Sequence, residues 1–163
     1  MTVKAEIPKV NGISVTISRI DESGNWTEAS SIDFGKLYFD NNDNIWRSSY
    51  YCAVDVGVNT NATDWTITHT RSSIANGSEK LDNNVNVTFM KQINDTEAEK
   101  LLEVSYKDSN NQSFAKSKLS GGWLRIYYGI AAGNKDAPGV EPITMEKPYG
   151  TYQGSVTLTL TTQ

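Results

Sequence analysis

The sequence predicts an all-β domain in which about eight strands form a two-sheet sandwich together with one short helix. Three observations lead to this fold class. Apolar and polar residues alternate with a period of two in many separate segments, as expected of strands with one buried face. Turns rich in Asn and Gly separate these segments. The chain has 163 residues, 37% of them hydrophobic, which is enough to enclose one core.

The alternating segments follow one another along almost the whole chain. The first has Val3, Ala5 and Ile7 on one side and ends at Pro8, which cannot continue a ladder of hydrogen bonds. Further strands are expected at residues 13–17, 31–39, 50–58, 65–70, 85–89, 123–130 and 156–160. Turns are expected at residues 40–44, 76–77, 82–84, 109–111 and 133–134.

One segment departs from the alternation. Residues 96–103 have the composition of a helix, and Thr96 with Glu99 matches a capping box. We expect a helix of one or two turns that joins two strands, because so short a segment is not stable as an isolated helix.

Composition excludes several classes of function. The net charge of −4 and the isoelectric point near 5.0 argue against a nucleic-acid partner, which selects a basic surface. No apolar run approaches the ~18 residues of a transmembrane helix, so no membrane span is expected. The N-terminus has no apolar signal core, and we expect an extracellular or cell-surface protein whose signal peptide is already absent from this numbering.

Residues suited to catalysis are few, and we expect no enzyme and no cofactor. His69 is the sole histidine and lies in phase with Trp65 and Ile67, as a packed side chain would. Cys52 is the sole cysteine and shares a face with Val54, which favours a small buried hydrophobe over a nucleophile.

A metal site is not expected either. Asp40, Asn42 and Asn44 match the first three ligands of a calcium loop. The match then ends, since Ile45 stands where the turn glycine belongs and Tyr51 where the bidentate glutamate belongs. A solvated hairpin loop explains the segment better.

Aromatic residues give a stronger candidate for a contact surface. Trp123, Arg125 and Tyr127 alternate with apolar residues and therefore share one strand face. This face could contact a neighbouring subunit, stack on the sugar rings of surface glycans, or be covered by the rest of the domain. The pattern alone leaves these alternatives open.

The first segment differs from the others because it stands at the chain terminus. Val3, Ala5 and Ile7 form a short apolar face, and residues 9–12 separate it from the next strand. Such a strand either pairs within its own sheet or leaves the domain and completes the sheet of a neighbour. The second alternative divides the chain into a donor strand with linker, residues 1–12, and a domain, residues 13–163.

Two further stretches resemble a known family. Residues 31–37, Ser-Ile-Asp-Phe-Gly-Lys-Leu, resemble the I-D-F-G-x-L strand of spore coat protein U-like and archaic chaperone–usher pilin domains. Residues 148–160 resemble the final P-x-G-x-Y-x-x-x-V-x-V-x-V strand of these domains, and the N-terminus resembles the mature start of subunits that polymerise by donor strand. The chain has one cysteine where many such domains have a pair.

This resemblance implies an immunoglobulin-like, pilin-like sandwich and a filament built from identical subunits. Residues 2–8 would then be the donor strand, with Val3, Ala5 and Ile7 inserted into the acceptor groove of a neighbour. Val156, Leu158 and Leu160 would form one wall of that groove, and a secretion chaperone and usher would be further partners. The competing function is a carbohydrate-binding or adhesin module at the cell surface.

Overall fold

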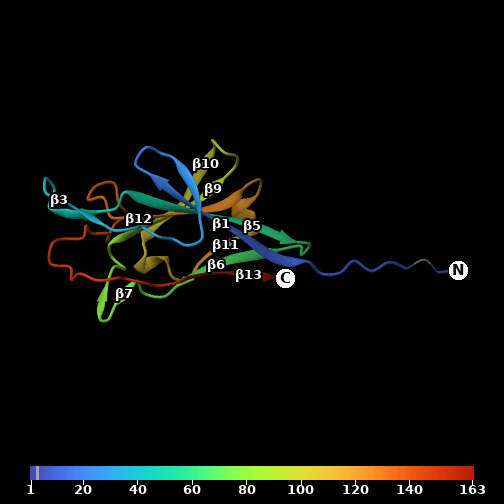
Figure 1. Ribbon diagram of the computed structural model, residues 1–163. Coiled ribbons are helices and arrows are strands. Elements are labelled where there is room, and N and C mark those ends of the chain that lie inside the picture. The colour runs from blue at the N-terminus through green and yellow to red at the C-terminus, as the bar shows by residue number, and fades with distance from the viewer. Residues whose placement is uncertain (3) are drawn as a thin grey trace.

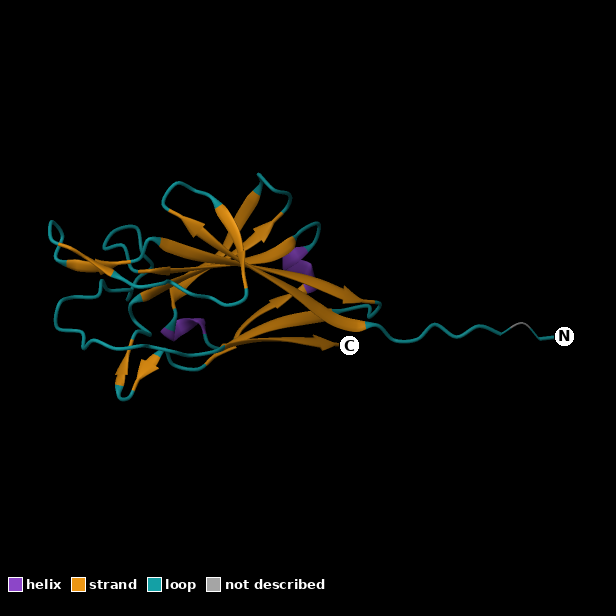
Figure 2. Ribbon diagram, viewed as in Figure 1, coloured by secondary structure: helices purple, strands orange, loops and turns teal. Residues whose placement is uncertain are grey.

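The computed structural model describes residues 1–2 and 4–163, which form thirteen β-strands and two short 3-10 helices (Figures 1 and 2). The strands are β1 (Asn11–Asp21), β2 (Trp26–Ala29), β3 (Tyr38–Asp40), β4 (Ile45–Arg47), β5 (Tyr50–Thr60), β6 (Trp65–Arg71), β7 (Ala75–Asn76), β8 (Glu79–Lys80), β9 (Val85–Gln92), β10 (Ala98–Ser105), β11 (Gln112–Ala115), β12 (Trp123–Ile130) and β13 (Val156–Thr162). The helices are η1 (Lys107–Ser109) and η2 (Lys116–Leu119). The all-β class is confirmed. Across these described residues, no helix has the length and apolar character needed to cross a membrane.

Six strands form the larger sheet, in the order β10-β9-β12-β5-β1-β2, and every neighbouring pair is antiparallel. Its longest ladder joins β1 and β5, which pair from Asn11 opposite Thr60 to Asp21 opposite Tyr50 without a shift in register. The even alternation in these strands produces that register, because a slip of one residue would turn every apolar side chain to the other face.

Three strands form the smaller sheet, in the antiparallel order β11-β6-β13. Residues 61–64 carry the chain from β5 in the larger sheet to β6 in the smaller one. Two hairpins, β3–β4 and β7–β8, lie outside both sheets. In Figures 1 and 2 the smaller sheet lies beneath one part of the larger sheet, and long loops continue beneath the rest.

The core lies between the two sheets. The larger sheet contributes fully buried side chains on alternate positions of β5, β9 and β12, including Val56, Val87, Phe89, Leu124 and Ile126. The smaller sheet contributes Ile67 and Phe114, and the ring centroids of Phe114 and Phe89 lie 4.8 Å apart across the interface.

His69 belongs to this core, as the sequence predicted. Its Nδ1 lies 2.8 Å from the carbonyl oxygen of Ser109, and its Nε2 lies 2.8 Å from the hydroxyl of Tyr128. A carbonyl only accepts, so Nδ1 carries the proton and Nε2 accepts from the Tyr128 hydroxyl. Both ring nitrogens are therefore engaged within the core, and the ring links the two sheets.

The predicted helix at residues 96–103 is wrong, because this segment enters β10 and pairs with β9. The Asn94 side chain accepts the backbone N–H groups of Thr96 and Glu97 at 2.9 and 2.8 Å and turns the chain back sharply. The helix-forming composition is local, whereas pairing with β9 also buries Leu102 partly against the core. Tertiary contacts thus override the intrinsic propensity.

The predicted strand at residues 31–39 is also wrong in its first seven residues, since only β3 at its end is a strand. Two carbonyls of this stretch bind side chains: Asp33 accepts from Arg19, and Phe34 accepts from Ser48 at 2.6 Å. Gly35 has a φ of +71°, which interrupts an extended ladder.

The N-terminal segment has no strand in its described residues, 1–2 and 4–10, and it extends away from the domain (Figures 1 and 2). Pairing of this segment within its own sheet is therefore not observed. Val3 lies outside the described residues. Strand β1 begins at Asn11, so residues 11 and 12, which were expected in the linker, belong to the sheet.

We expect the free energy of unfolding to fall as the pH drops below about 6.5. Burial lowers the pKa of His69 below its ordinary value, so the unfolded chain binds a proton that the folded chain excludes. The loss amounts to at most about 1.4 kcal/mol per pH unit. Urea unfolding at pH 7 and pH 5.5 measures this loss. Most carboxylates titrate below pH 5.5, so they contribute little to the difference between the two values. An identical slope in His69→Gln would contradict the assignment.

Candidate functional site

A cleft of about 1430 Å³ opens where the smaller sheet ends. One wall is the irregular segment 31–37 between β2 and β3, and the other is the segment 145–156 that leads into β13. The floor includes Ile17, Ile74, Leu81, Val85, Tyr128, Ile130 and Ile143. Four of these floor residues, Leu81, Val85, Tyr128 and Ile143, are members of the buried core, so the cleft opens directly onto the core.

The wall formed by residues 31–37 is fixed to the larger sheet. The guanidinium of Arg19 donates to the Asp33 carbonyl through Nε and a terminal nitrogen, both at 3.2 Å, and also pairs with the Asp33 carboxylate. The Cys52 thiol lies 3.5 Å from the same carbonyl, and burial raises its pKa. These contacts hold Ile32, Phe34 and Leu37 partly buried against the core.

The wall formed by residues 145–156 is fixed to a hairpin instead. Gln153 and Ala75 form an isolated antiparallel β-bridge, and the Asn76 side chain donates to the Tyr149 carbonyl at 3.3 Å. The Lys147 ammonium donates to the carbonyl of Lys80 at 2.8 Å. The hairpin β7–β8 therefore carries this wall. Its outer part exposes large apolar side chains, with Met145 59% and Tyr149 98% accessible.

Strand β13 continues this wall as the edge of the smaller sheet. All seven of its residues are in register with β6, and no strand of the described chain pairs with its other edge. The residues predicted as a groove wall, Val156, Leu158 and Leu160, alternate with exposed threonines and are partly buried against the core. Val156 lines the cleft, whereas Leu158 and Leu160 lie farther along β13 opposite His69 and Ile67.

This edge differs from the edges formed by β2, β10 and β11, although β2 pairs only with Ile17–Ile20 and leaves Asn11–Thr16 of β1 without a neighbour on that side among the described strands. Strands β2 and β11 have only four residues each. Strand β10 has a bulge between Lys100 and Leu102 and bears Glu99, Lys100 and Glu103. Short length, bulges and charges all hinder the addition of a further strand. The β13 sequence, Val-Thr-Leu-Thr-Leu-Thr-Thr, has no charge and no proline, and its ladder has no bulge.

The described part of the predicted donor strand is exposed. Ile7 is 86% accessible, and Ala5 is exposed as well. In Figure 1 the N-terminal segment leaves beside the C-terminus, whereas the loop that leads into β13 lies toward the opposite end. The apolar segment and the cleft are thus at different ends of the molecule, and the structure does not bring them together within one chain.

Trp123, Arg125 and Tyr127 lie together on the outer face of the larger sheet, as their spacing predicted. Arg125 pairs with Asp55 on β5 through Nε at 2.6 Å and a terminal nitrogen at 3.0 Å, which raises the pKa of Arg125. The Trp123 indole also donates to Asp55, at 3.3 Å. A charged pair on adjacent strands therefore organises this face.

Two aromatic residues that the sequence analysis missed complete this outer-face cluster. Trp26 packs edge-on against Tyr127 at 6.5 Å and lies under the Arg125 guanidinium at 4.8 Å. Tyr51 lies 6.1 Å from Tyr127. Both are among the exposed large hydrophobic residues, at 46% for Trp26 and 42% for Tyr51. Sequence spacing could not reveal them, because they come from other strands.

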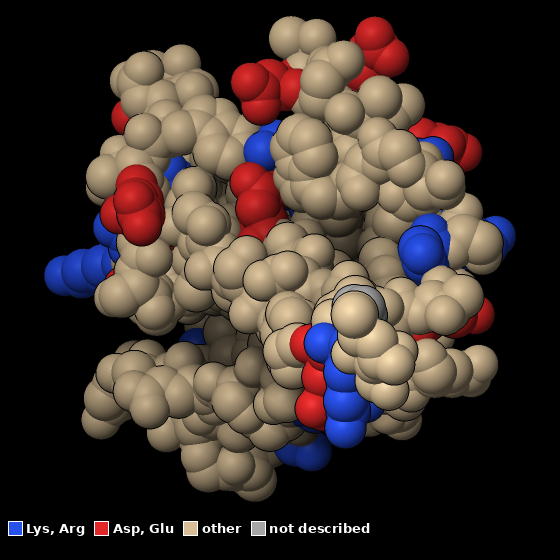
Figure 3. Space-filling model, turned by 90° about the vertical axis from the view of Figure 1, so that its right-hand side faces the viewer, with Lys and Arg blue, Asp and Glu red and all other residues tan. Residues whose placement is uncertain are grey.

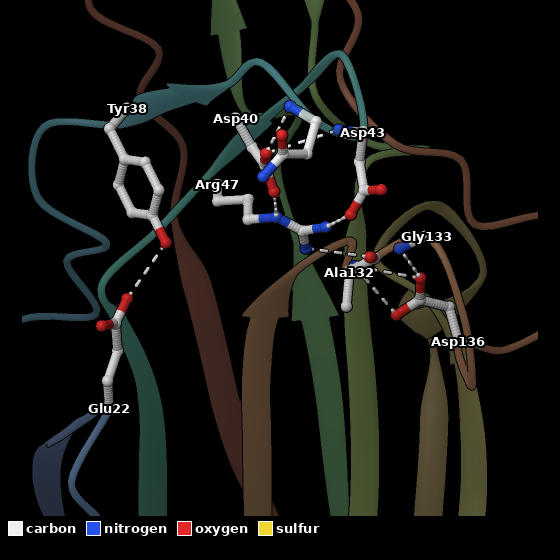
Figure 4. Close-up of polar contacts among 9 residues, drawn as sticks. Glu22, Tyr38, Asp40, Asp43, Arg47, Ala132, Gly133 and Asp136 are labelled. Carbon is white, nitrogen blue, oxygen red and sulfur yellow. Dashed lines mark hydrogen bonds and ion pairs between the residues drawn. The ribbon is translucent and has the colours of Figure 1, made fainter.

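The calcium-like loop at residues 40–44 is a hairpin turn whose carboxylates bind Arg47 (Figure 4). Arg47 pairs with Asp40 at 2.7 Å and with Asp43 at 2.5 Å, and it donates to the Ala132 carbonyl at 3.0 Å. Hydrogen bonding from Arg47 lowers the pKa of Asp40. Across residues 1–2 and 4–163, no group of three or more His, Cys, Asp or Glu side chains is placed to hold a metal ion.

Charge does not single out a binding surface at the end of the molecule that carries the termini. Figure 3 shows this end, where acidic and basic side chains are scattered among uncharged residues and do not gather into a patch of one sign.

Comparisons with known proteins give no relative: no family model matches the chain, and no curated protein or solved structure matches it. Function therefore has to be inferred from the two features described above, the apolar cleft and the aromatic cluster.

We expect Asp55→Ala to lower the free energy of unfolding by about 1–3 kcal/mol, because it leaves the Arg125 guanidinium, whose side chain is 11% exposed, without its partner. Urea unfolding followed by tryptophan fluorescence measures the change. Asp95→Ala, in the exposed turn before β10, is the matched control and should have little effect. An equal loss from Asp55→Ala in an Arg125→Met background would contradict the pairing.

Proposed function

We propose that this protein is the structural subunit of an extracellular filament that polymerises head-to-tail, with the N-terminal segment of one subunit inserted into the cleft of the next. The observation that carries the proposal is the cleft itself. Its floor is apolar and opens onto the core, and one wall continues into β13, whose outer edge has no partner strand among the described residues.

An inserted strand suits this cleft for two physical reasons. Its backbone supplies hydrogen bonds to the free edge of a strand, and its alternate side chains enter the apolar groove. Each Val- or Ile-sized side chain that becomes fully buried contributes roughly 1.5–3 kcal/mol. The contrast between the uncharged edge of β13 and the bulged, charged edge of β10 supports addition at β13.

The N-terminal segment has the matching pattern. Val3, Ala5 and Ile7 alternate with Lys4 and Glu6, so an extended segment presents apolar side chains to a groove and charges to solvent. The exposed Ile7 side chain supports a role outside its own domain.

The placement of the two features favours an open chain of subunits. Insertion of a segment at one end into a cleft toward the other is a heterologous contact, and such contacts produce filaments when they do not close into rings. The identical subunit is thus the main partner. The apolar floor of the cleft would be exposed before assembly, so a secretion chaperone that fills it, together with an usher, is a further partner in this proposal.

The family resemblance supports the proposal through position. The stretch that resembles the I-D-F-G-x-L strand lines one wall of the cleft, although it is irregular in this structure. Residues 148–160, which resemble the final strand, include most of the other wall and the first five residues of β13. An immunoglobulin-like, pilin-like sandwich and an extracellular location are parts of the same proposal.

A carbohydrate-binding or adhesin role is the second candidate, and the outer-face cluster favours it. Trp26 and Tyr51 are exposed beside the rigid Arg125–Asp55 pair, and this combination offers ring faces and polar groups to a surface glycan. Saturable quenching of tryptophan fluorescence by a glycan, lost in Trp26→Ala, would establish it.

We expect the full chain to form filaments or high oligomers, and a chain lacking residues 1–8 to remain a folded monomer. Ile7→Asp should abolish assembly, because a carboxylate would enter an apolar groove without a partner. Lys4→Ala, on the opposite side of the segment, should assemble normally. Negative-stain microscopy and light scattering measure the outcome.

A peptide of residues 1–10 separates insertion from other kinds of association. It should bind the truncated chain and raise its melting temperature, because a ligand that binds only the folded state stabilises it. The Ile7→Asp peptide should not. Folded monomers of both the full and the truncated chain, with no effect of the peptide, would disprove donor-strand polymerisation.

A further inference from the structure

Where the N-terminal segment joins the domain, the Asn61 side chain forms hydrogen bonds with the backbone of Pro8 and of Val10, on either side of Lys9. The Asn61 side chain donates through Nδ2 to the Pro8 carbonyl at 2.8 Å and accepts the Val10 N–H through Oδ1 at 2.9 Å. The Asn61 backbone N–H donates to the Val10 carbonyl at 3.3 Å. Three hydrogen bonds from one residue thus hold the backbone of residues 8–10, directly before β1 begins.

Asn61 is suited to this contact by its chemistry and its position. A side-chain amide has a donor and an acceptor in one rigid plane, so it can form hydrogen bonds at the same time with a carbonyl and with an N–H two residues further along the chain. Asn61 directly follows β5, whose last residue, Thr60, pairs with Asn11 at the start of β1. Pro8 adds a fixed φ at the point where the held residues end.

The loop that contains Asn61 is itself anchored on several sides. Residues 61–64 connect the two sheets. The Asp64 carbonyl accepts the N–H of Gln163 at the C-terminus, at 3.1 Å, and the Lys116 ammonium donates to the Thr63 carbonyl at 3.0 Å. One loop therefore binds both chain ends and both sheets.

We propose that Asn61 is a positioning residue that fixes the direction in which the N-terminal segment leaves the domain. The chain then departs from a rigid bracket, defined as Asn61 with residues 8–10, and not from a free hinge. If the segment is inserted into a neighbour, which rests on the proposed function, the bracket fixes the orientation of one subunit relative to the next and stiffens the filament.

Backbone relaxation of the full chain tests the bracket directly. The Ile7→Asp background keeps the chain at full length and, under the proposed function, unassembled. The Lys9 and Val10 amides should have order parameters near 0.85, as in rigid backbone, and fall below about 0.6 in Asn61→Ala. Asn59→Ala, on the exposed face of β5, is the matched control and should leave them unchanged.

A conservative variant separates positioning from general destabilisation. Asn61→Asp keeps the acceptor for the Val10 N–H but places a carboxylate oxygen against the Pro8 carbonyl. Val10 should therefore stay ordered while Lys9 loses order, with an unchanged melting temperature. Equal order parameters in all variants overturn the proposal, as does a general loss of order throughout β1.

Filament images then test the consequence for assembly. With Ile7 restored, Asn61→Ala filaments should form but bend more strongly than those of the original chain. Unchanged stiffness, despite a loss of order at Lys9 and Val10, overturns the claim about filaments and leaves the proposed function intact. If the original chain forms no filaments, the proposed function fails, and the relaxation result alone decides whether the bracket exists.

Discussion

The smaller sheet has three strands, whereas the larger sheet that it covers has six. The two irregular wall segments and the cleft between them follow from this mismatch. An apolar sheet face must be buried against another layer. Where β11, β6 and β13 end, the chain continues the second layer with two irregular segments, residues 31–37 and 145–156. These segments leave a gap above Val85, Tyr128 and Ile143, because they are not joined to one another by a ladder of hydrogen bonds.

The edge strands β10 and β13 differ in how well they are protected against pairing with another strand. At β10 the chain combines a bulge with charged residues, which is the usual protection against pairing with another molecule. At β13 the ladder is regular and the outward residues are threonines, which are neutral and favourable in strands. The two edges have similar lengths, so length does not explain the difference in protection.

The sequence allowed the long strands β1, β5, β6, β9, β12 and β13 to be predicted, but not the short strands β2 and β11. The alternations at Ile13–Ile17 in β1, along β5 and in β13 led to the correct faces, because a period of two follows directly from strand geometry. It failed at β10, where a helix-like composition is overridden by pairing with β9, and at residues 31–37, where side chains of Arg19 and Ser48 take the backbone carbonyls. Those contacts join residues distant in sequence, and no local pattern reports them. For the same reason the sequence did not indicate that segment 145–155 lines a cleft or that Trp26 and Tyr51 join the outer-face cluster. Of the predicted groove wall Val156, Leu158 and Leu160, only Val156 lines the cleft, and the groove itself stays a prediction.

The attachment of segment 145–156 to the β7–β8 hairpin has a consequence for how such a protein can diversify. Its contacts through Gln153, Tyr149 and Lys147 use backbone atoms on at least one side, and they avoid the central strands. Substitutions at the exposed Met145 and Tyr149 should therefore alter the opening with little effect on the packing of the sheets. If the proposed insertion holds, substitutions in this outer part of the wall change which segments the cleft accepts while the two sheets stay as they are.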